Sequence, residues 1–190
     1  MNYMINDYKD IRLELFQIKH LNNPNYIRWL KDIEVVKYLG RPEYFKDVDI
    51  EEIHKYYNSI ISNKYIKFYA VYFIPDNKFV GTAKISLSNS YNEEYDIADI
   101  GIMIGDRNYW GKGLATMILS SISIFAVNSL KVRKLTAGAI SENIAVIRSF
   151  QKIGFKIEGV LRKKIHLNGE YLDHVLLGCF NEELIKDYNQ

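Results

Sequence analysis

The stretch DRNYWGKGLAT, residues 106–116, holds residue types that bind phosphate groups. Its two glycines, Gly111 and Gly113, allow the backbone to come close to a ligand. The run that follows has the apolar density and length of a buried helix, and a helix N-terminus offers free N–H groups and about half a positive charge to an anion. Arg107 and Lys112 add mobile positive charge. The stretch therefore predicts either a pyrophosphate site or a strand-to-helix turn that needs two glycines.

Two common phosphate-binding motifs are absent from this stretch. The pattern G-x-x-x-x-G-K-[ST] does not occur, and G-x-G-x-x-G fails because Met117 lies near the position of the third glycine. A metal site is also not expected, because the four histidines lack an H-x-H or H-x-x-x-H spacing and the chain has one cysteine. That residue, Cys179, lies in the apolar context VLLGCF, which predicts a buried strand position.

A second motif, ENIAVIRSFQKIGF at residues 142–155, follows one expected strand later. In this order the two motifs resemble the GNAT superfamily of acyl-CoA N-acyltransferases, whose loop is Arg/Gln-x-x-Gly-x-Gly/Ala. Here 108–113 occupies that loop, with Asn108 where Arg or Gln is usual and Arg107 one residue earlier. The segments YIRWLKDIEVVKYLG and EGVLRKKIHLNGEYLDHVLLG are similar to the branch with ribosomal-protein N-terminal and amino-sugar or small-amine acetyltransferases.

The resemblance implies an α/β (α+β) fold, a single domain over 1–190 with a splayed, mixed central sheet flanked by helices. It implies acetyl-CoA as cosubstrate, with pantetheine amides paired to the edge of the strand before the loop, as an added strand would be. It also implies that backbone N–H groups of the loop hold the pyrophosphate. The residues expected at the cofactor are Ile102, Met103, Ile104, Arg107, Asn108, Trp110, Gly111, Lys112, Gly113, Leu114, Ala115, Thr116, Asn143 and Arg148.

The chemistry implied is direct transfer of an acetyl group to a primary amine, whose proton a base must remove. Asp99, on a strand of otherwise apolar character, lies where this branch often carries a glutamate, and it is the catalytic candidate. Glu34 and His166 are alternative bases, or ordinary surface residues. Many relatives carry a tyrosine as general acid where this chain has Phe150, which cannot donate a proton.

The acceptor site is expected between the early helices and the hairpin of 160–175. Candidate lining residues are Trp29, Glu34, Tyr38, Tyr44, His166, Tyr171 and Asp173. The alternative is that most of them belong to the core, and the apolar helix face favours this for Trp29. The N-terminal segment and GEYLDHV resemble members that acetylate amino sugars on nucleotides, so a small-molecule amine of this kind is the expected partner. N-terminal acetylation of a ribosomal or other protein and polyamine acetylation remain open. So does a different class, an inactive acetyl-CoA-binding regulatory protein.

Composition and charge limit the class of protein to which the chain can belong. The chain has 190 residues, 48% of them apolar and 25% charged, as in ordinary globular domains. A net charge of +2 is too small to favour nucleic-acid binding. Neither a signal peptide nor an apolar run long enough to span a membrane is evident, so we expect a cytoplasmic monomer or homodimer.

Apolar periodicity and turn residues predict the elements that must position these residues. Asn23 and Pro24 can start a helix that Asp32 can divide and Gly40 can end, and Asp47 or Asp49 can cap the next one. Asn168–Gly169 predicts a hairpin turn. Strands are expected at 10–17, 67–74, 78–88, 97–104, 134–140 and twice within 155–180, and helices at 23–40, 47–62, 113–130 and 143–154.

Overall fold

An eight-stranded sheet forms the centre of the protein in the computed structural model, which describes residues 5–8, 10–40, 49–89, 95–167 and 169–185. The strand order is β1-β2-β3-β4-β5-β6-β8-β7, and all neighbours are antiparallel except β5 and β6. The strands are β1 Ile5–Tyr8, β2 Ile11–Leu15, β3 Ile66–Phe73, β4 Lys78–Ser88, β5 Ile97–Ile104, β6 Lys134–Ile140, β7 Lys156–Leu167 and β8 Glu170–Phe180.

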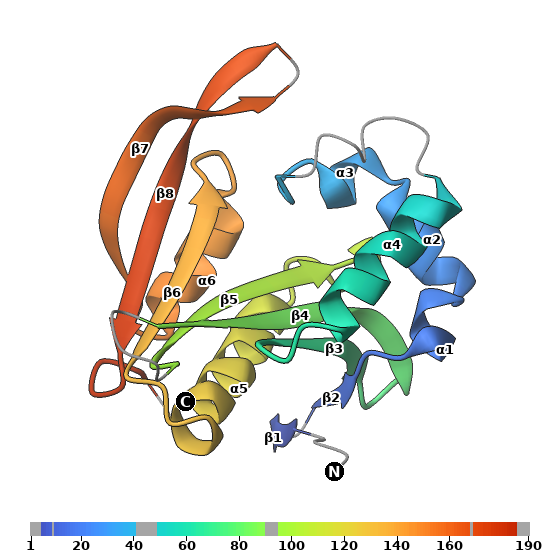
Figure 1. Ribbon diagram of the computed structural model, residues 1–190, viewed down its shortest axis with the longest axis horizontal. Helices are drawn as coiled ribbons and strands as arrows, with labels where there is room; N and C mark the ends of the chain where they lie inside the picture. Colours follow the sequence, from blue (N-terminus) through green and yellow to red (C-terminus); the bar gives the residue numbers. More distant parts are fainter. Residues whose placement is uncertain (1–4, 9, 41–48, 90–94, 168, 186–190) are drawn as a thin grey trace.

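Helices cover both faces of this sheet, but unevenly (Figure 1). They are α1 Ile18–Leu21, α2 Pro24–Leu30, α3 Ile33–Val36, α4 Ile50–Ile61, α5 Leu114–Ser129 and α6 Ile144–Lys152. Side chains of α5 and α6 pack with strand residues such as Tyr69, Ile100 and Leu135 in the main core. Side chains of α1 to α4 form a second cluster on the opposite face with Ala70, Phe79 and others. That opposite face is therefore covered toward the α1–α4 end of the sheet.

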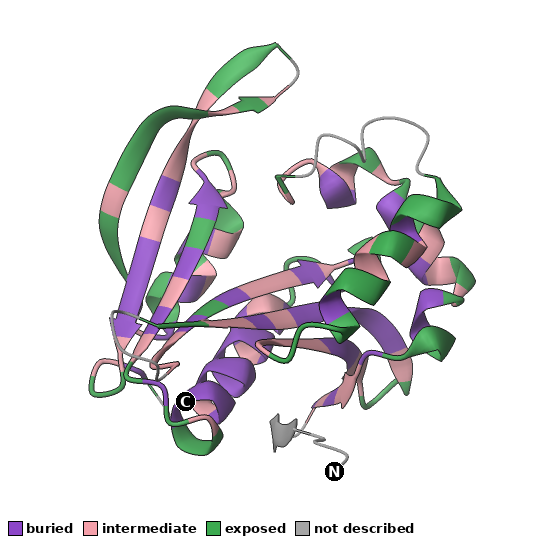
Figure 2. Cartoon of the chain, viewed as in Figure 1, coloured by how far each residue is buried: buried purple, intermediate pink, exposed green. Residues whose placement is uncertain are grey.

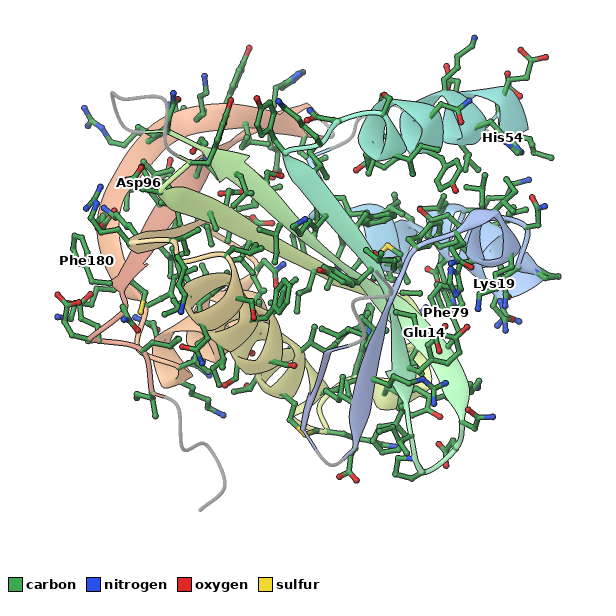
Figure 3. The ribbon with its side chains drawn as sticks, turned by 60° about the horizontal axis from the view of Figure 1, so that its bottom comes forward. Glu14, Lys19, His54, Phe79, Asp96 and Phe180 are labelled. Atoms are coloured by element: carbon green, nitrogen blue, oxygen red, sulfur yellow. The ribbon has the colours of Figure 1, made fainter. Side chains whose placement is uncertain are left out.

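Burial along the elements follows the sequence pattern. Helix α5 is apolar nearly all round, and residues such as Ile118, Leu119 and Ile122 are fully buried, as a helix enclosed by sheet and neighbours must be. Strand β7 lies at the edge of the sheet and is mostly exposed, as Figure 2 shows. Figure 3 shows Glu14, Lys19 and Phe79 together at the α1 end and Asp96 at the opposite end.

The parallel pair β5–β6 separates after a short contact. Pairing is confined to Ile97–Lys134, Ala98–Leu135 and Asp99–Thr136, whereas the other edge of β6 pairs with β8 along its whole length. Arg133 fastens the closed end, because its N–H donates to the Asp96 carbonyl at 2.7 Å and its Nε donates to Asp96 Oδ2 at 3.0 Å. The remaining residues of β5 therefore present a backbone edge that β6 does not cover.

The expected helix starts agree with the structure, and one expected helix end does not. Oxygens of the Asn23, Asp32 and Asp49 side chains accept hydrogen bonds from N–H groups two residues ahead, at 2.9, 3.0 and 3.0 Å. Asp32 thus divides the expected helix over 23–40 into α2 and α3. Gly40 does not end it, because α3 already stops at Val36.

Two short elements were not expected from the sequence, namely β1 and α1. Both are four residues long, too short for apolar periodicity to identify. The expected hairpin is formed by β7 and β8, although Asn168, like Asp47, lies outside the described residues. Cys179 is buried in β8, as expected. Within the described part of the chain, no helix combines the length and apolar character needed to span a membrane.

Replacement of Gly105 by Ala is expected to destabilise the fold, because a Cβ there would overlap the buried ring of Trp29. Overpacking of this kind costs about 1–3 kcal/mol in the free energy of unfolding. Chemical denaturation measures the loss. Gly101→Ala is the matched control, because no described atom lies within 4 Å of its Cβ position. Equal stability of the two variants would contradict the packing described.

Candidate functional site

The glycine loop between β5 and α5 is shaped to receive an anion. Gly111 and Gly113 have φ values of 74° and 78°, in the left-handed region that favours glycine, and a Cβ on either would meet no described atom within 4 Å. Gly113 is the N-cap of α5, and the Met117 N–H donates to its carbonyl at 3.2 Å. The N–H groups of Leu114, Ala115 and Thr116 precede the first helical hydrogen bonds and are oriented toward the loop. This donor set and the open space beside it fit a pyrophosphate.

The buried carboxylate of Asp106 stabilises the start of the loop. Asp106 accepts a hydrogen bond from the Asn108 N–H at 3.1 Å and lies 2.8 Å from Lys78 Nζ. Burial alone would raise the pKa of the Asp106 carboxyl, but Lys78 and Asn108 together hold it below its ordinary value. The Tyr109 hydroxyl donates to Asp76, whose carboxylate raises the pKa of Tyr109 to about 12. These bonds fix the short 3₁₀ turn Arg107–Tyr109 ahead of the glycines.

Two cations lie beside the loop. Arg107 Nη1 is 3.5 Å from Asp32 Oδ2, and its guanidinium lies 5.6 Å from the centre of the Trp110 ring. Lys112 Nζ lies 5.6 Å from the centre of the Tyr109 ring. Arg107, Asn108 and Lys112 are exposed, so they can turn toward a bound anion. The two cations that the sequence predicts for an anion site, Arg107 and Lys112, therefore both lie beside the loop with exposed side chains.

The free edge of β5 consists of alternate residues. The Gly105 N–H donates to Val80 of β4 at 2.9 Å, and the Met103 carbonyl points at Gly81 of β4. Because backbone groups alternate along a strand, Ile102 and Ile104 direct theirs toward the gap beside β6. The expectation that Met103 offers its backbone to a ligand is therefore wrong, because β4 takes it. Trp110 Nε1 donates to the Ile104 carbonyl at 2.9 Å and closes the loop end of this edge.

Helix α6 faces the same core as α5. Asn143 is its N-cap, with Oδ1 accepting the Val146 N–H at 3.3 Å, and Arg148 is exposed without an ion-pair partner among the described residues. Phe150 is 2% exposed and packs on Phe155 with ring centroids 4.8 Å apart. The position where many relatives carry a tyrosine is thus occupied by a core ring.

A polar face lies on the side of the sheet opposite α5, where β5 and β6 part. We define it by Lys84, Asp99, Gly101, Thr136 and His174. Strand register places Lys84 directly across from Gly101, and the Thr136 hydroxyl donates to Asp99 Oδ2 at 3.3 Å. The face is open at Gly101, because no described atom lies within 4 Å of its Cβ position.

Asp99 is the carboxylate of this polar face. As a residue it is exposed, yet its carboxyl group is partly removed from water beside β6, and this desolvation raises its pKa. Lys84, the Thr136 hydroxyl and His174 oppose the rise without cancelling it. A carboxylate with a raised pKa in such a position is suited to proton transfer.

Lys84 and His174 were not identified in the sequence analysis. The alternation of side chains along β4 and β8 is the pattern that could have placed them beside Asp99, once the strand order was known. His174 lies over Gly138, because a Cβ on that glycine would be 2.5 Å from Nε2 of the imidazole. Gly138 therefore supplies the room that the His174 ring occupies.

The expected acceptor residues are only partly brought together. Trp29 is 2% exposed beneath Gly105, so the expectation that it lines an acceptor site is wrong: it packs in the second core cluster. Glu34 accepts a hydrogen bond from Lys37 Nζ at 2.7 Å, and this ammonium lies 5.1 Å from the centre of the Tyr38 ring. Both Glu34 and Tyr38 remain half-buried on the early helices.

The hairpin residues lie farther out. His166 and Tyr171 are exposed near the hairpin turn, with ring centroids 4.8 Å apart, in the part of β7 and β8 that extends beyond β6 (Figure 1). Asp173 Oδ1 accepts the Lys163 N–H at 2.8 Å and supports the irregular part of β7. Tyr44 lies outside the described residues. Among those described, no group of three His, Cys, Asp or Glu side chains could hold a metal ion.

Both sequence and structure match known acetyltransferases. Residues 11–156 match the model of the acetyltransferase (GNAT) domain. The probable N-acetyltransferase YjcK of Bacillus subtilis (strain 168) is 29% identical over 115 residues, which are 60% of this chain and 62% of that protein. This match therefore spans less than two thirds of the relative's own length.

Two solved structures have the same fold. The spermidine N-acetyltransferase of Vibrio cholerae, in complex with CoA and spermine, has a TM-score of 0.79 at 18% identity and covers 93% of this chain and 98% of its own. The ribosomal L7/L12 α-N-protein acetyltransferase RimL, in complex with coenzyme A, has a TM-score of 0.78 at 20% identity and covers 94% and 98%.

The chain belongs to the GNAT acetyltransferase family, because the family model covers most of its length. The resemblance inferred from the two motifs is thereby confirmed, and so is the α/β fold with a splayed mixed sheet.

Replacement of Gly113 by Glu is expected to lower affinity for coenzyme A more than tenfold, a change of over about 1.4 kcal/mol. The new side chain would put bulk and negative charge where Gly113 now leaves open space. Calorimetric titration with coenzyme A measures the loss. Gly169→Glu is the matched control, because Gly169 has a similar φ of 83° but lies at the hairpin turn. Unchanged affinity in a folded Gly113 variant would refute this position for the anion.

Proposed function

We propose that this protein transfers the acetyl group of acetyl-CoA to the primary amine of a small acceptor. The observation that carries the proposal is the gap between β5 and β6, which has the glycine loop at one end and the polar face on one side. A donor held along the edge of β5 and an amine placed above Gly101 would meet at this gap.

Different residues of the chain would bind different parts of acetyl-CoA, which supplies an activated acetyl thioester. Backbone N–H groups from Gly111 to Thr116 would bind the pyrophosphate at the start of α5. The Trp110 N–H, expected to join them, instead donates to the Arg107 carbonyl at 3.1 Å. The backbone groups of Ile102 and the N–H of Ile104 would pair with the amides of the pantetheine arm, as in β-strand addition, because Trp110 already takes the Ile104 carbonyl. Exposed Arg107, Lys112 and Arg148 would complement the phosphate charge.

Asp99 would attract the ammonium form of the acceptor and promote loss of its proton, directly or through water. Its raised pKa brings this carboxyl closer to the operating pH, which makes it a better partner for proton transfer than an ordinary aspartate. Phe150 offers no proton to the departing thiolate, so solvent would supply it. A thiol with a pKa near 8.5 is already a fair leaving group.

The acceptor that we propose is an amino sugar, in its nucleotide-linked form. Lys84 is half-buried beside Gly101 and forms no ion pair with a described residue, so it can receive an anionic group of the acceptor. A polyamine would instead favour several carboxylates, because each of its ammonium groups must be complemented. Asp99 is the one carboxylate of the polar face, and the acidic residues Glu93 and Glu94 lie outside the described residues.

Replacement of Asp99 by Asn is expected to reduce turnover strongly while leaving affinity for acetyl-CoA unchanged. In the wild-type protein, activity should fall as the pH decreases through the pKa of Asp99, because the protonated acid loses the negative charge that attracts the ammonium and favours loss of its proton. The raised pKa places this fall above the range of an ordinary carboxyl. Steady-state rates over a pH series measure it. A variant with the wild-type rate at every pH would remove Asp99 from the reaction.

An acceptor screen tests the proposed substrate class. Release of free thiol from acetyl-CoA is measured with UDP-linked amino sugars, spermidine, amino acids and peptides of ribosomal N-terminal sequence. Lys84→Glu is expected to lower kcat/KM for the UDP-amino sugar about tenfold and to raise that for spermidine, because the local charge reverses. Lys131→Glu, which makes the same change in the turn after α5, is the control. Preference of the wild-type protein for peptides or spermidine would overturn the amino-sugar assignment.

A second candidate function follows from Phe150. Without a side chain to protonate the thiolate there, the protein could bind acetyl-CoA as a regulatory module and transfer nothing. Tight binding of acetyl-CoA with no turnover for any amine in the screen would support that function. Turnover with one of these acceptors would exclude it.

A further inference from the structure

His174 of β8 and Asp99 of β5 lie on the same face of the sheet, on either side of β6. Strand register brings the two together on one face: Asp99 pairs with Thr136 of β6, and Gly138, two residues further along β6, lies under the imidazole of His174. The ring extends from β8 across β6, because its Nε2 and Cε1 come within 2.5 and 2.7 Å of the Cβ position of Gly138. The imidazole is half-buried, which restricts its movement.

The groups around this imidazole leave it free to exchange a proton with a ligand. Asp99 interacts with it electrostatically from β5, and Lys84 of β4 lies on the far side of Asp99. The residue opposite it on β7 is Leu161, and the neighbouring Arg162 is exposed. Farther along the same face, Lys134 and Glu158 form an ion pair at 2.7 Å. Among the described residues, no hydrogen bond or ion pair is formed by the His174 side chain.

We propose that His174 is the group that takes the proton from the acceptor's ammonium, with Asp99 stabilising the imidazolium that results. This inference rests on the proposed function and refines it: the proton passes to His174, and Asp99 acts through its negative charge. Imidazole is the side chain that most often acts as a general base, and the Asp99 carboxylate on the same face can interact with the cation that forms. Gly138 is then a positioning residue, because its missing side chain allows the ring to lie over the gap.

The proton balance of the step is simple. The ammonium loses one proton to the neutral imidazole, and the nitrogen lone pair becomes available for attack. The amine nitrogen loses a second proton as the amide forms, which balances protonation of the thiolate. His174 afterwards releases its proton to solvent and becomes neutral again, so each turnover releases one proton in total.

His174→Gln tests the proposal, because glutamine is polar and of similar size but does not accept a proton near neutral pH. The expected result is a fall of about 10²-fold in kcat/KM for the acceptor, with unchanged affinity for acetyl-CoA. The dependence of the rate on pH should also change, because the proposed proton acceptor is lost. His54→Gln, on α4 and away from the gap, is the matched control and should retain the wild-type rate and pH profile. A His174 variant with the wild-type pH profile would overturn the proposal.

Gly138→Ala tests the position of the ring independently of the loss of the imidazole. The added Cβ would displace the imidazole from the gap, so kcat should fall while acetyl-CoA affinity is retained. A folded variant with unchanged kcat would show that this position of His174 does not matter for turnover, and would also overturn the proposal. This second variant decides the question if His174→Gln fails to fold.

A measurement without turnover separates this inference from the proposed function. In the free protein, the ring-proton NMR resonances of His174 should shift when Asp99 is replaced by Asn, whereas those of His54 and His166 should not. Failure of the proposed function would appear as absent turnover with every acceptor in the wild-type protein. Failure of this inference alone would appear as turnover that His174→Gln leaves intact, or as His174 resonances indifferent to Asp99→Asn.

Discussion

The separation of β5 from β6 is the constraint on which the rest of the site depends. Three residue pairs, reinforced by Arg133 and Asp96, hold the strands together at one end. Beyond them, backbone groups of the half-buried residues Ile102 and Ile104 lose the neighbouring strand, and such groups need another partner, such as a ligand or water. The main core of α5 and α6 behind the sheet stabilises the two strands in this open arrangement.

The loop after β5 and the glycines on the opposite face keep the space at this opening accessible. Asp106 and Lys78 fix the turn that leads out of β5, and glycines with left-handed backbone then leave the start of α5 uncovered. On the opposite face, Gly101 and Gly138 omit side chains where the strands part, and His174 fills only the second of these spaces. Backbone geometry therefore governs the donor side, and side-chain chemistry governs the acceptor side.

The donor side could be predicted from the sequence because its determinants are local. Gly111, Gly113 and the apolar run after them are contiguous, and their conformations follow from residue type. The acceptor side could not be predicted to the same extent, because Lys84, Asp99 and His174 come from three strands whose order the sequence does not specify. Trp29 and Met103 were misassigned because both roles came from the family resemblance. In the structure Trp29 packs in the second core cluster, and β4 takes the backbone groups of Met103.

The indole of Trp110 sets a limit on the length of the free strand edge. It occupies the Ile104 carbonyl at one end, while pairing with β6 ends at Asp99 on the other. The stretch from Ile100 to Ile104 spans four residue steps, or about 14 Å at roughly 3.4 Å per step. The short edge limits the length of any extended chain that can pair with it. It accommodates an extended arm with a few amide groups, but it is too short and too enclosed for another protein chain to add a full strand, so the opening carries little risk of edge-to-edge aggregation.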